Sequence, residues 1–262
     1  MSKAAEPSIQ CSVEDRGRQG TIATVTVDNP LRLNILNTPL ITQLIDAVDA
    51  LSRDARLRVV ILTGAGERAF IGGADIREMA GLDRTTASAF IARLHRACLA
   101  LRSLRVPVIA RIRGYCLGAG LEIAASCDLR AAAAGSSFGM PEVKVGVPSV
   151  IEAALLPRLV GRGKARELVL TGESISAEEA LQCGLVQKVV APGDLDKAVE
   201  DWVGSILSAG PEAIRLQKTL LREWENLPLD EAIERGIESF AEAYQTGEPR
   251  LLMQRFLDRK RS

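Results

Sequence analysis

VPVIARIRGYCLGAGLEIAASCDLRAAAAGSSFGMPEVKVGVP, residues 106–148, is the stretch around which the rest of this chain is organised. Its first part, Val106–Ile112, is rich in Val and Ile and bounded by Pro and Gly, which predicts a buried strand. A turn of small residues follows at Gly114–Gly120, and Leu121–Ser126 is predicted to form a short helix that begins within that turn. Because such a turn leaves backbone N–H groups at the helix start without partners, it favours an anionic group in front of it.

Two carboxylates flank this turn. Glu122 falls in the first turn of the predicted helix, and Glu142 follows in the loop that begins at Phe138. Most glutamates are solvated surface charges, but both of these have apolar neighbours in the sequence, where a charge needs a partner or a function. Unpaired amides together with two carboxylates are the groups needed to form and protonate an enolate.

The composition is that of an ordinary soluble globular protein. The chain has 262 residues, of which 47% are hydrophobic and 25% are charged, enough for a large core. Lys+Arg and Asp+Glu both number 33, so a general attraction to nucleic acid or to an anionic membrane is not expected. The five cysteines form no CxxC pair, which favours a reduced, intracellular protein.

The sequence also carries no pattern typical of export or of a membrane protein. The first ten residues contain no apolar signal region, and no segment approaches the roughly 18 apolar residues of a membrane span. A cytoplasmic location without membrane contact is therefore the expectation.

The start of the chain predicts a hairpin, a helix and a buried strand in succession. Ile9–Glu14 and Thr21–Val27 are β-branched or alternating segments on either side of a Gly-containing turn. Asn37–Pro39 predicts a helix N-terminus with Pro in its first turn, and Val59–Leu62 predicts the next strand. The apolar face of that helix is expected to comprise Leu40, Leu44, Ile45, Val48 and Leu51.

Strand, loop and helix then recur through residue 193, whereas the end of the chain is helical. The recurrence predicts an α/β fold with a parallel, wound core over residues 1–193. Residues 194–262 are expected to form a helical region whose surplus of apolar residues is buried against the core or another subunit. The predicted helices are Leu195–Leu207, Pro211–Trp224, Leu229–Tyr244 and Pro249–Lys260.

Four ordered motifs resemble the crotonase (enoyl-CoA hydratase/isomerase) family, and most of all its enoyl-CoA hydratases. Ala69–Ile76 is similar to the family's first oxyanion loop, Gly114–Asp128 to its second, and Phe138–Pro148 to its second catalytic segment. With Asn29–Leu36 and Leu170–Val186, the resemblance covers nearly the whole chain. It implies a crotonase-like spiral of ββα units followed by a C-terminal helical oligomerisation region, in a homotrimer or a hexamer made of two trimers.

The resemblance also implies a reaction, the reversible addition of water to a 2-enoyl-CoA thioester. Glu122 and Glu142 match the family's catalytic glutamates, with Glu142 exchanging a proton with C2 and Glu122 chiefly holding and activating water. The backbone N–H groups of Ala74 and Ala119 would form the oxyanion hole. No metal or redox cofactor is expected, since coenzyme A is part of the substrate.

For coenzyme A, the resemblance implies a path along the first oxyanion loop. The residues expected to line it are Gly72, Gly73, Asp75 and Ile76. Many relatives carry a basic residue directly after the Pro of the Asn-Pro segment, but here that position is Leu31 and Arg32 comes one later. Arg32 therefore either reaches a phosphate or is a surface charge.

The chain departs from the family after Pro148, where many hydratases continue with a Gly-rich segment and this chain has Ser149–Leu155. Val150 and Ile151 are expected to reshape the acyl pocket. Glu152 either completes a capping box with Ser149 or is a third carboxylate facing that pocket.

This departure leaves other reactions open, namely dehydration or isomerisation of an unusual acyl-CoA. A member that binds coenzyme A or RNA without catalysis is a further alternative, although the zero net charge argues against RNA. The single histidine, His95, is not expected to be catalytic, and a His-based metal site is not expected either.

Overall fold

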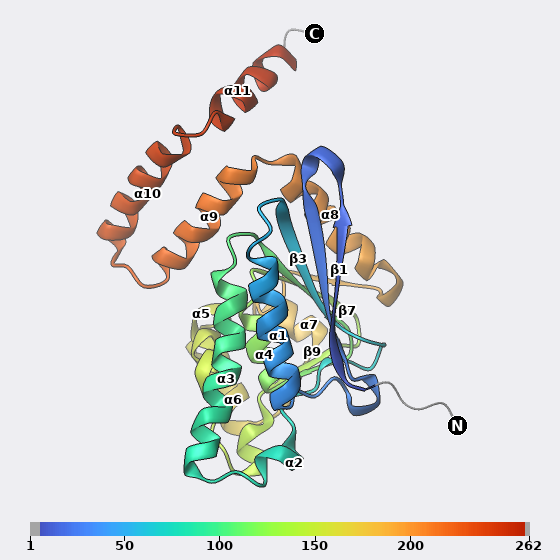
Figure 1. The fold of residues 1–262 in the computed structure, drawn as a ribbon. Coiled ribbons are helices and arrows are strands. Elements are labelled where there is room, and N and C mark those ends of the chain that lie inside the picture. Colours follow the sequence, from blue (N-terminus) through green and yellow to red (C-terminus); the bar gives the residue numbers. More distant parts are fainter. Residues whose placement is uncertain (1–5, 260–262) are drawn as a thin grey trace.

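The computed structural model describes residues 6–259, so the outer ends of the two predicted domains, residues 1–5 and 260–262, lie outside the described residues. Two β-sheets form its centre (Figure 1). The larger has the order β1-β2-β3-β5-β7-β10 and the smaller the order β4-β6-β8-β9. The strands of the larger sheet are β1 (Ser8–Asp15), β2 (Thr21–Asp28), β3 (Leu57–Gly64), β5 (Val108–Ile112), β7 (Leu129–Ala133) and β10 (Lys188–Val190).

From β3 to β8, successive strands alternate between the two sheets. The smaller sheet consists of β4 (Ala69–Ile71), β6 (Tyr115–Leu117), β8 (Ser137–Gly139) and β9 (Ser174–Ser176). Each of β3, β5 and β7 is followed in the chain by a strand of the smaller sheet, so every turn of the chain adds one strand to each sheet. The hairpin β1–β2 is antiparallel, while β2, β3, β5, β7 and β10 pair in parallel. The predicted hairpin and the predicted parallel, wound α/β fold are both confirmed.

Helices cover the sheets and connect their strands. The first of them, α1, begins as predicted, because the side chain of Asn37 accepts a hydrogen bond from the N–H of Leu40. The five residues predicted for its apolar face are all buried. The helices before the C-terminal region are α1 (Thr38–Leu51), α2 (Ile76–Met79), α3 (Arg84–Ser103), α4 (Ala119–Ala125), α5 (Leu156–Leu159), α6 (Gly161–Thr171) and α7 (Ala177–Gln182).

Short 3₁₀-helices form the remaining turns. They are η1 (Gly17–Gln19), η2 (Pro30–Arg32), η3 (Pro141–Val145), η4 (Ile151–Leu155) and η5 (Pro192–Asp194). The segment after Val150 forms a 3₁₀ turn, η4, that continues into α5.

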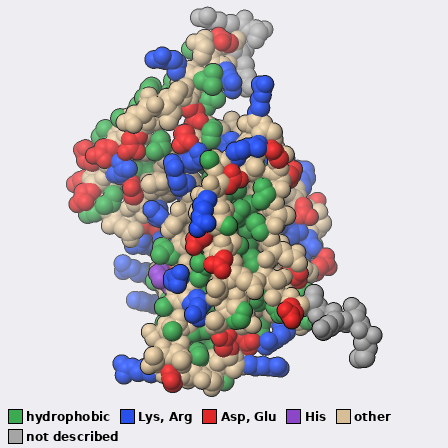
Figure 2. All heavy atoms as spheres, viewed as in Figure 1, with side chains coloured by type: hydrophobic (Ala, Val, Ile, Leu, Met, Phe, Trp, Pro, Cys, Tyr) green, Lys and Arg blue, Asp and Glu red, His purple; other side chains and the backbone are tan. Residues whose placement is uncertain are grey.

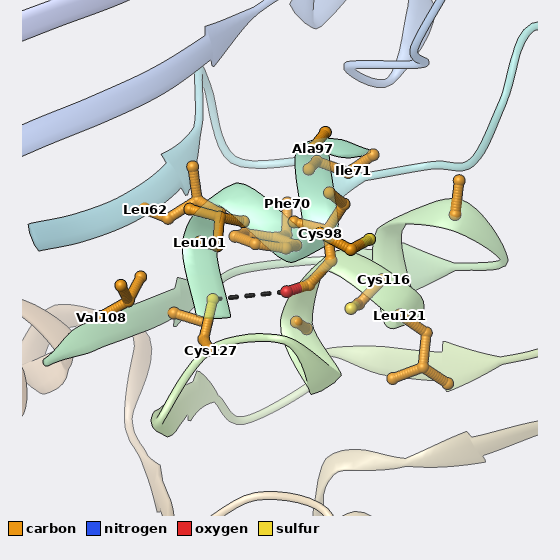
Figure 3. Close-up of a cluster of buried hydrophobic side chains, with 14 of the residues drawn as sticks. Leu62, Phe70, Ile71, Ala97, Cys98, Leu101, Val108, Cys116, Leu121 and Cys127 are labelled. Atoms are coloured by element: carbon orange, nitrogen blue, oxygen red, sulfur yellow. Dashed lines mark hydrogen bonds between the residues drawn. The ribbon is translucent and has the colours of Figure 1, made fainter. Parts of the chain in front are cut away.

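The larger sheet buries both of its faces. On β3, Val60 and Leu62 point into the main core, and Val59 points to the opposite face, as the two-residue period of a strand requires. Helix α8 (Leu195–Ser208) covers that opposite face. Within the main core, Figure 3 shows Phe70 of β4 packed beside Leu101 of α3.

The C-terminal helices α9 (Pro211–Trp224), α10 (Leu229–Ala243) and α11 (Glu248–Arg259) confirm the predicted helical region. Helix α9 is tied to the core by the buried Lys218, whose Nζ donates to Asp128 Oδ2 and to the carbonyl of Val106, each at 2.8 Å. Helices α10 and α11 extend away from the sheets (Figure 1). Their exposed apolar side chains, some visible in Figure 2, include Leu229, Ile233, Ile237, Phe240, Leu251, Met253 and Leu257.

Between residues 6 and 259, no helix combines the length and the apolar character that crossing a bilayer requires.

One close backbone contact brings α4 against the smaller sheet, and it depends on glycine. A Cβ at Gly120 would overlap the carbonyl oxygen of Ile71, the last residue of β4. Gly120→Ala is therefore expected to destabilise the fold by about 1–3 kcal/mol, as overpacking does. Gly204 lies within α8 with open space around it, so Gly204→Ala is expected to stabilise by up to about 1 kcal/mol. Urea unfolding of both variants measures this; a Gly120→Ala variant as stable as the native chain would contradict the packing described.

Candidate active site

Three loops of the predicted site meet at one edge of the smaller sheet. Gly72–Ala74 follows β4, Gly118–Ala119 follows β6, and Pro141–Glu142 follows β8 after one intervening residue. The strands β4, β6 and β8 are neighbours and run parallel, so their carboxyl ends lie at the same edge. Ligands of α/β proteins commonly bind outside the carboxyl ends of strands.

The three loops surround a cavity of about 440 Å³, a size suited to a small-molecule ligand. Glu122 and Glu142 both line it, together with small residues of the loops. The rest of its wall is largely apolar and includes Ile76, Met79, Leu82, Phe90, Ile91, Leu94, Val145, Val147 and Val150. The cavity thus offers two carboxyl groups and accessible backbone on one side and an apolar space on the other.

Glu122 lies deep in this cavity, with a side chain that is only 4% exposed. Its Oε1 accepts a hydrogen bond from the N–H of Ala153 at 3.2 Å. Burial and, after it, the negative charge of Glu142 raise the pKa of Glu122 to about 8, and the Ala153 N–H partly opposes this shift. Glu122 is therefore largely protonated at neutral pH.

Glu142 lies in η3 and is only partly buried. Its Oε2 accepts a hydrogen bond from Ser149 Oγ at 2.8 Å. Its Oε1 lies against Gly118, which has a φ of 52° and at which a Cβ would overlap that oxygen. Glycine is required here both by the backbone conformation and by the approach of the carboxylate.

The two amides predicted for the oxyanion hole lie on opposite loops of the same cavity. The backbone of Leu36 donates to the carbonyl of Gly73 and accepts from the N–H of Asp75, each at 2.8 Å. The N–H of Ala74, between them, takes no part in this pair of hydrogen bonds. Ala119 is the first residue of α4, where an N–H has no acceptor within the helix. Both residues line the cavity, as an oxyanion hole requires.

Of the residues predicted along the coenzyme A path, Gly72, Gly73 and Ile76 line the cavity. Asp75 is 6% exposed; its side chain accepts from the N–H of Arg77 at the start of α2 and pairs with Arg32 at 3.1 Å. The Arg32 side chain is still 40% exposed. Asp75 thus anchors the loop and holds Arg32 beside it.

The segment after Pro148 differs from the expectation for Ser149. The capping box is wrong: the residue that precedes η4 is Val150, and no side chain caps this turn. The Ser149 hydroxyl instead donates a hydrogen bond to Glu142. A hydrogen bond to a carboxylate is stronger than the bond that the hydroxyl would accept from a backbone N–H as a helix cap. Val150 lines the cavity, and its contribution to an acyl pocket stays a prediction.

The next two residues point elsewhere. Ile151 lines a second cavity, between η4 and α6. The Glu152 side chain is 4% exposed and turns toward α3, where its Oε1 lies 2.9 Å from Nδ1 of His95. The sequence analysis assigned no role to His95 and did not predict its contact with Glu152. The signal in the sequence was weak: a single histidine and an additional glutamate, each with apolar neighbours.

No group of three or more His, Cys, Asp or Glu side chains within residues 6–259 is arranged to hold a metal ion.

The raised pKa of Glu122 predicts how stability depends on pH. A carboxyl whose pKa is 4.5 in the unfolded chain and about 8 in the fold opposes folding when ionised, so its penalty grows as pH rises from about 4.5 to 8. Glu122→Gln is therefore expected to be more stable than the native chain at pH 8.5, by on the order of a few kcal/mol, and similar to it at pH 5. Urea unfolding at the two pH values measures the difference; an equal difference at both would contradict the shift.

Comparisons with known proteins identify the family of the chain. The family model described as Enoyl-CoA hydratase/isomerase matches residues 17–262. A short-chain-enoyl-CoA hydratase of Clostridium acetobutylicum is 36% identical over 245 residues, covering 93% of this chain and 94% of the relative. A crotonyl-CoA hydratase of Syntrophomonas wolfei is 35% identical over 246 residues, covering 94% of this chain and 95% of the relative.

Solved structures show the same fold. An enoyl-CoA hydratase from Mycobacterium smegmatis superposes with a TM-score of 0.91 at 31% identity, over 97% of each chain. One from Bacillus anthracis superposes with a TM-score of 0.89 at 31% identity, over 95% of this chain and 96% of that chain. With a family model that matches nearly the whole chain and relatives of this similarity, the chain belongs to the crotonase (enoyl-CoA hydratase/isomerase) family.

Proposed function

We propose that this protein is an enoyl-CoA hydratase that adds water reversibly across the 2,3 double bond of a 2-enoyl-CoA thioester. The observation that carries the proposal is the pair Glu122 and Glu142, which line one cavity together with the amide-bearing loops at Ala74 and Ala119. An acyl-CoA substrate is implied by the family.

The pair supplies the acid and the base that hydration needs. Burial keeps a proton on Glu122 near neutral pH, and because the two carboxyls interact, that proton belongs to the pair. When the oxygen of water bonds to C3, one carboxylate takes the proton of that water and the other carboxyl delivers a proton to C2. Following the family resemblance, we assign C2 to Glu142 and the water chiefly to Glu122, so the proton that the pair shares must lie on Glu142 when water attacks C3. Dehydration runs the same transfers in reverse.

The oxyanion hole would act at the thioester oxygen. As C3 is attacked, negative charge develops on that oxygen, and the N–H groups of Ala74 and Ala119 would donate to it. Small residues around them, Gly73 and Gly118, let the thioester approach the backbone closely. Arg32, paired with Asp75 beside the first loop, is the proposed contact for a phosphate of coenzyme A.

The direct test is the loss of conjugated enoyl-thioester absorbance when the purified protein is mixed with crotonyl-CoA and longer homologues. Turnover on at least one chain length is expected. No turnover on any chain length would refute the proposal.

A second candidate is dehydration or isomerisation of an unusual acyl-CoA. It is favoured by the segment after Pro148, because Val150 contributes to the cavity wall and Ser149 occupies one oxygen of Glu142. Incubation with a 3-enoyl-CoA, followed by product analysis, separates it from hydration. Retention on immobilised coenzyme A, set beside salt-dependent retention on RNA, tests the non-catalytic alternatives.

We propose that the chain assembles into a homotrimer or a dimer of trimers. We further propose that it works in the cytoplasm, on fatty acyl-CoA in β-oxidation. The exposed apolar side chains of α10, such as Ile237 and Phe240, support burial against other copies of the chain. Light scattering coupled to size-exclusion chromatography gives the mass; a monomer at micromolar concentration would contradict this assembly.

A further inference from the structure

A partly buried contact between His95 and Glu152 connects α3 to the turn behind the two candidate catalytic glutamates. The Glu152 carboxylate, in the first turn of η4, lies 2.9 and 3.2 Å from Nδ1 of His95 through its two oxygens. Arg102, about two helical turns after His95 on α3, lies 4.0 Å from the same carboxylate. Because a carboxylate that is 4% exposed needs compensation, these contacts hold η4 against α3. Figure 2 shows the single histidine at the surface, among basic side chains.

The residue after Glu152 contacts the candidate catalytic pair directly. Ala153 donates its N–H to Oε1 of Glu122, so the position of η4 decides whether this hydrogen bond forms. The residue before Glu152, Ile151, has a φ of 39°, a left-handed conformation that costs a β-branched residue about 1–3 kcal/mol. Such a turn persists only where its surroundings hold it in place, and Glu152 supplies a tether next to the strained residue.

We propose that Glu152 is a positioning residue: held by His95, it fixes η4 so that the Ala153 amide remains on Glu122. This rests on the proposed function, because it assigns Glu152 to the same site. Glu152 is thus neither a helix cap nor a group facing the acyl chain.

Electrostatics give Glu152 a second effect on the pair. After burial itself and the charge of Glu142, the charge of Glu152 also raises the pKa of Glu122. The other ionisable groups around Glu152 are His95, Arg102 and Cys98 of α3, and burial keeps the pKa of the Cys98 thiol well above its ordinary value. Removing the charge at position 152 therefore lowers the pKa of Glu122, whereas losing the Ala153 hydrogen bond raises it.

Variants of the exposed partner test the tether with little risk to folding, since the His95 side chain is 46% exposed. His95→Ala is expected to lower kcat about 10-fold or more with KM little changed, because the catalytic geometry loosens. His95→Gln, whose amide can still donate to Glu152, should restore most of that loss. Arg96→Gln, which removes an exposed cation from the neighbouring position on α3, is the matched control and should behave as the native enzyme.

A titration that needs no turnover separates this inference from the proposed function. In protein labelled with ¹³C at the glutamate carboxyls, the Glu122 signal, identified by its loss in Glu122→Gln, is expected to titrate at higher pH in His95→Ala than in the native chain, because a displaced η4 withdraws the Ala153 N–H that lowers the pKa of Glu122. A protein inactive on every enoyl-CoA would refute the function but leave this shift measurable. The inference would be overturned by an unchanged Glu122 titration in His95→Ala, or by native kcat in that variant.

Discussion

Glu122→Gln and Glu142→Gln are each expected to lower kcat by about 10²–10⁴-fold, while the binding of acyl-CoA changes little. Glutamine preserves the volume and a hydrogen-bonding group but cannot take up or release the proton. The Ala153 N–H can still donate to the amide oxygen at position 122, and Ser149 Oγ to that at position 142, so the geometry of the site should persist. Steady-state kinetics with crotonyl-CoA and a binding titration with a saturated acyl-CoA measure the two quantities.

The double variant Glu122→Gln/Glu142→Gln tests whether the two carboxyls act as a unit. If they share one proton, removing the second carboxyl costs far less than removing the first, so the double variant should be much less impaired than the product of the two single effects. Glu67→Gln, at a side chain that is 82% exposed, is a control expected to keep native kinetics. Near-native hydration by either single variant would show that the residue is a structural charge and that the two-carboxylate mechanism is wrong.

Ala119→Pro is expected to lower kcat by about 10²–10³-fold, the typical effect of losing one oxyanion donor. A side-chain change cannot remove a backbone amide, but proline can. Ala119 is the first residue of α4, the helical position that proline tolerates best, and the preceding Gly118 has φ 52° and ψ −120°, outside the helical conformation that proline disfavours. The substitution therefore removes the N–H while α4 is preserved.

Ala119→Gly is the matched variant, because it also changes the side chain yet keeps the N–H, and it should retain kcat within a few fold. Circular dichroism and a coenzyme A binding measurement establish that Ala119→Pro is folded and still accepts the ligand. Full activity in a folded Ala119→Pro variant would remove this amide from the proposed oxyanion hole.

Much of the fold follows from local sequence patterns. The β1–β2 hairpin and the start of α1 at Asn37 were predictable because turns, caps and amphipathic faces depend on neighbouring residues. The small-residue turn at Gly114–Gly120 was predictable for the same reason, since a close approach of the backbone excludes most side chains. The position of Glu122 and Glu142 within apolar segments indicated burial or function, and the structure places both in one cavity.

Other features depended on where elements distant in sequence meet. The Glu122–Ala153 contact spans 31 residues and the His95–Glu152 contact 57, and no local pattern specifies such partners. Ser149 had a plausible local role as a helix cap, yet its hydroxyl bonds Glu142, because the fold brings a carboxylate within its reach. The sequence alone thus determined which side chains can exchange a proton and which segments favour helix or strand. The packing of η4 against α3 and α4 decided the surroundings of those residues, because burial and the direction of each side chain exist only once the chain is folded.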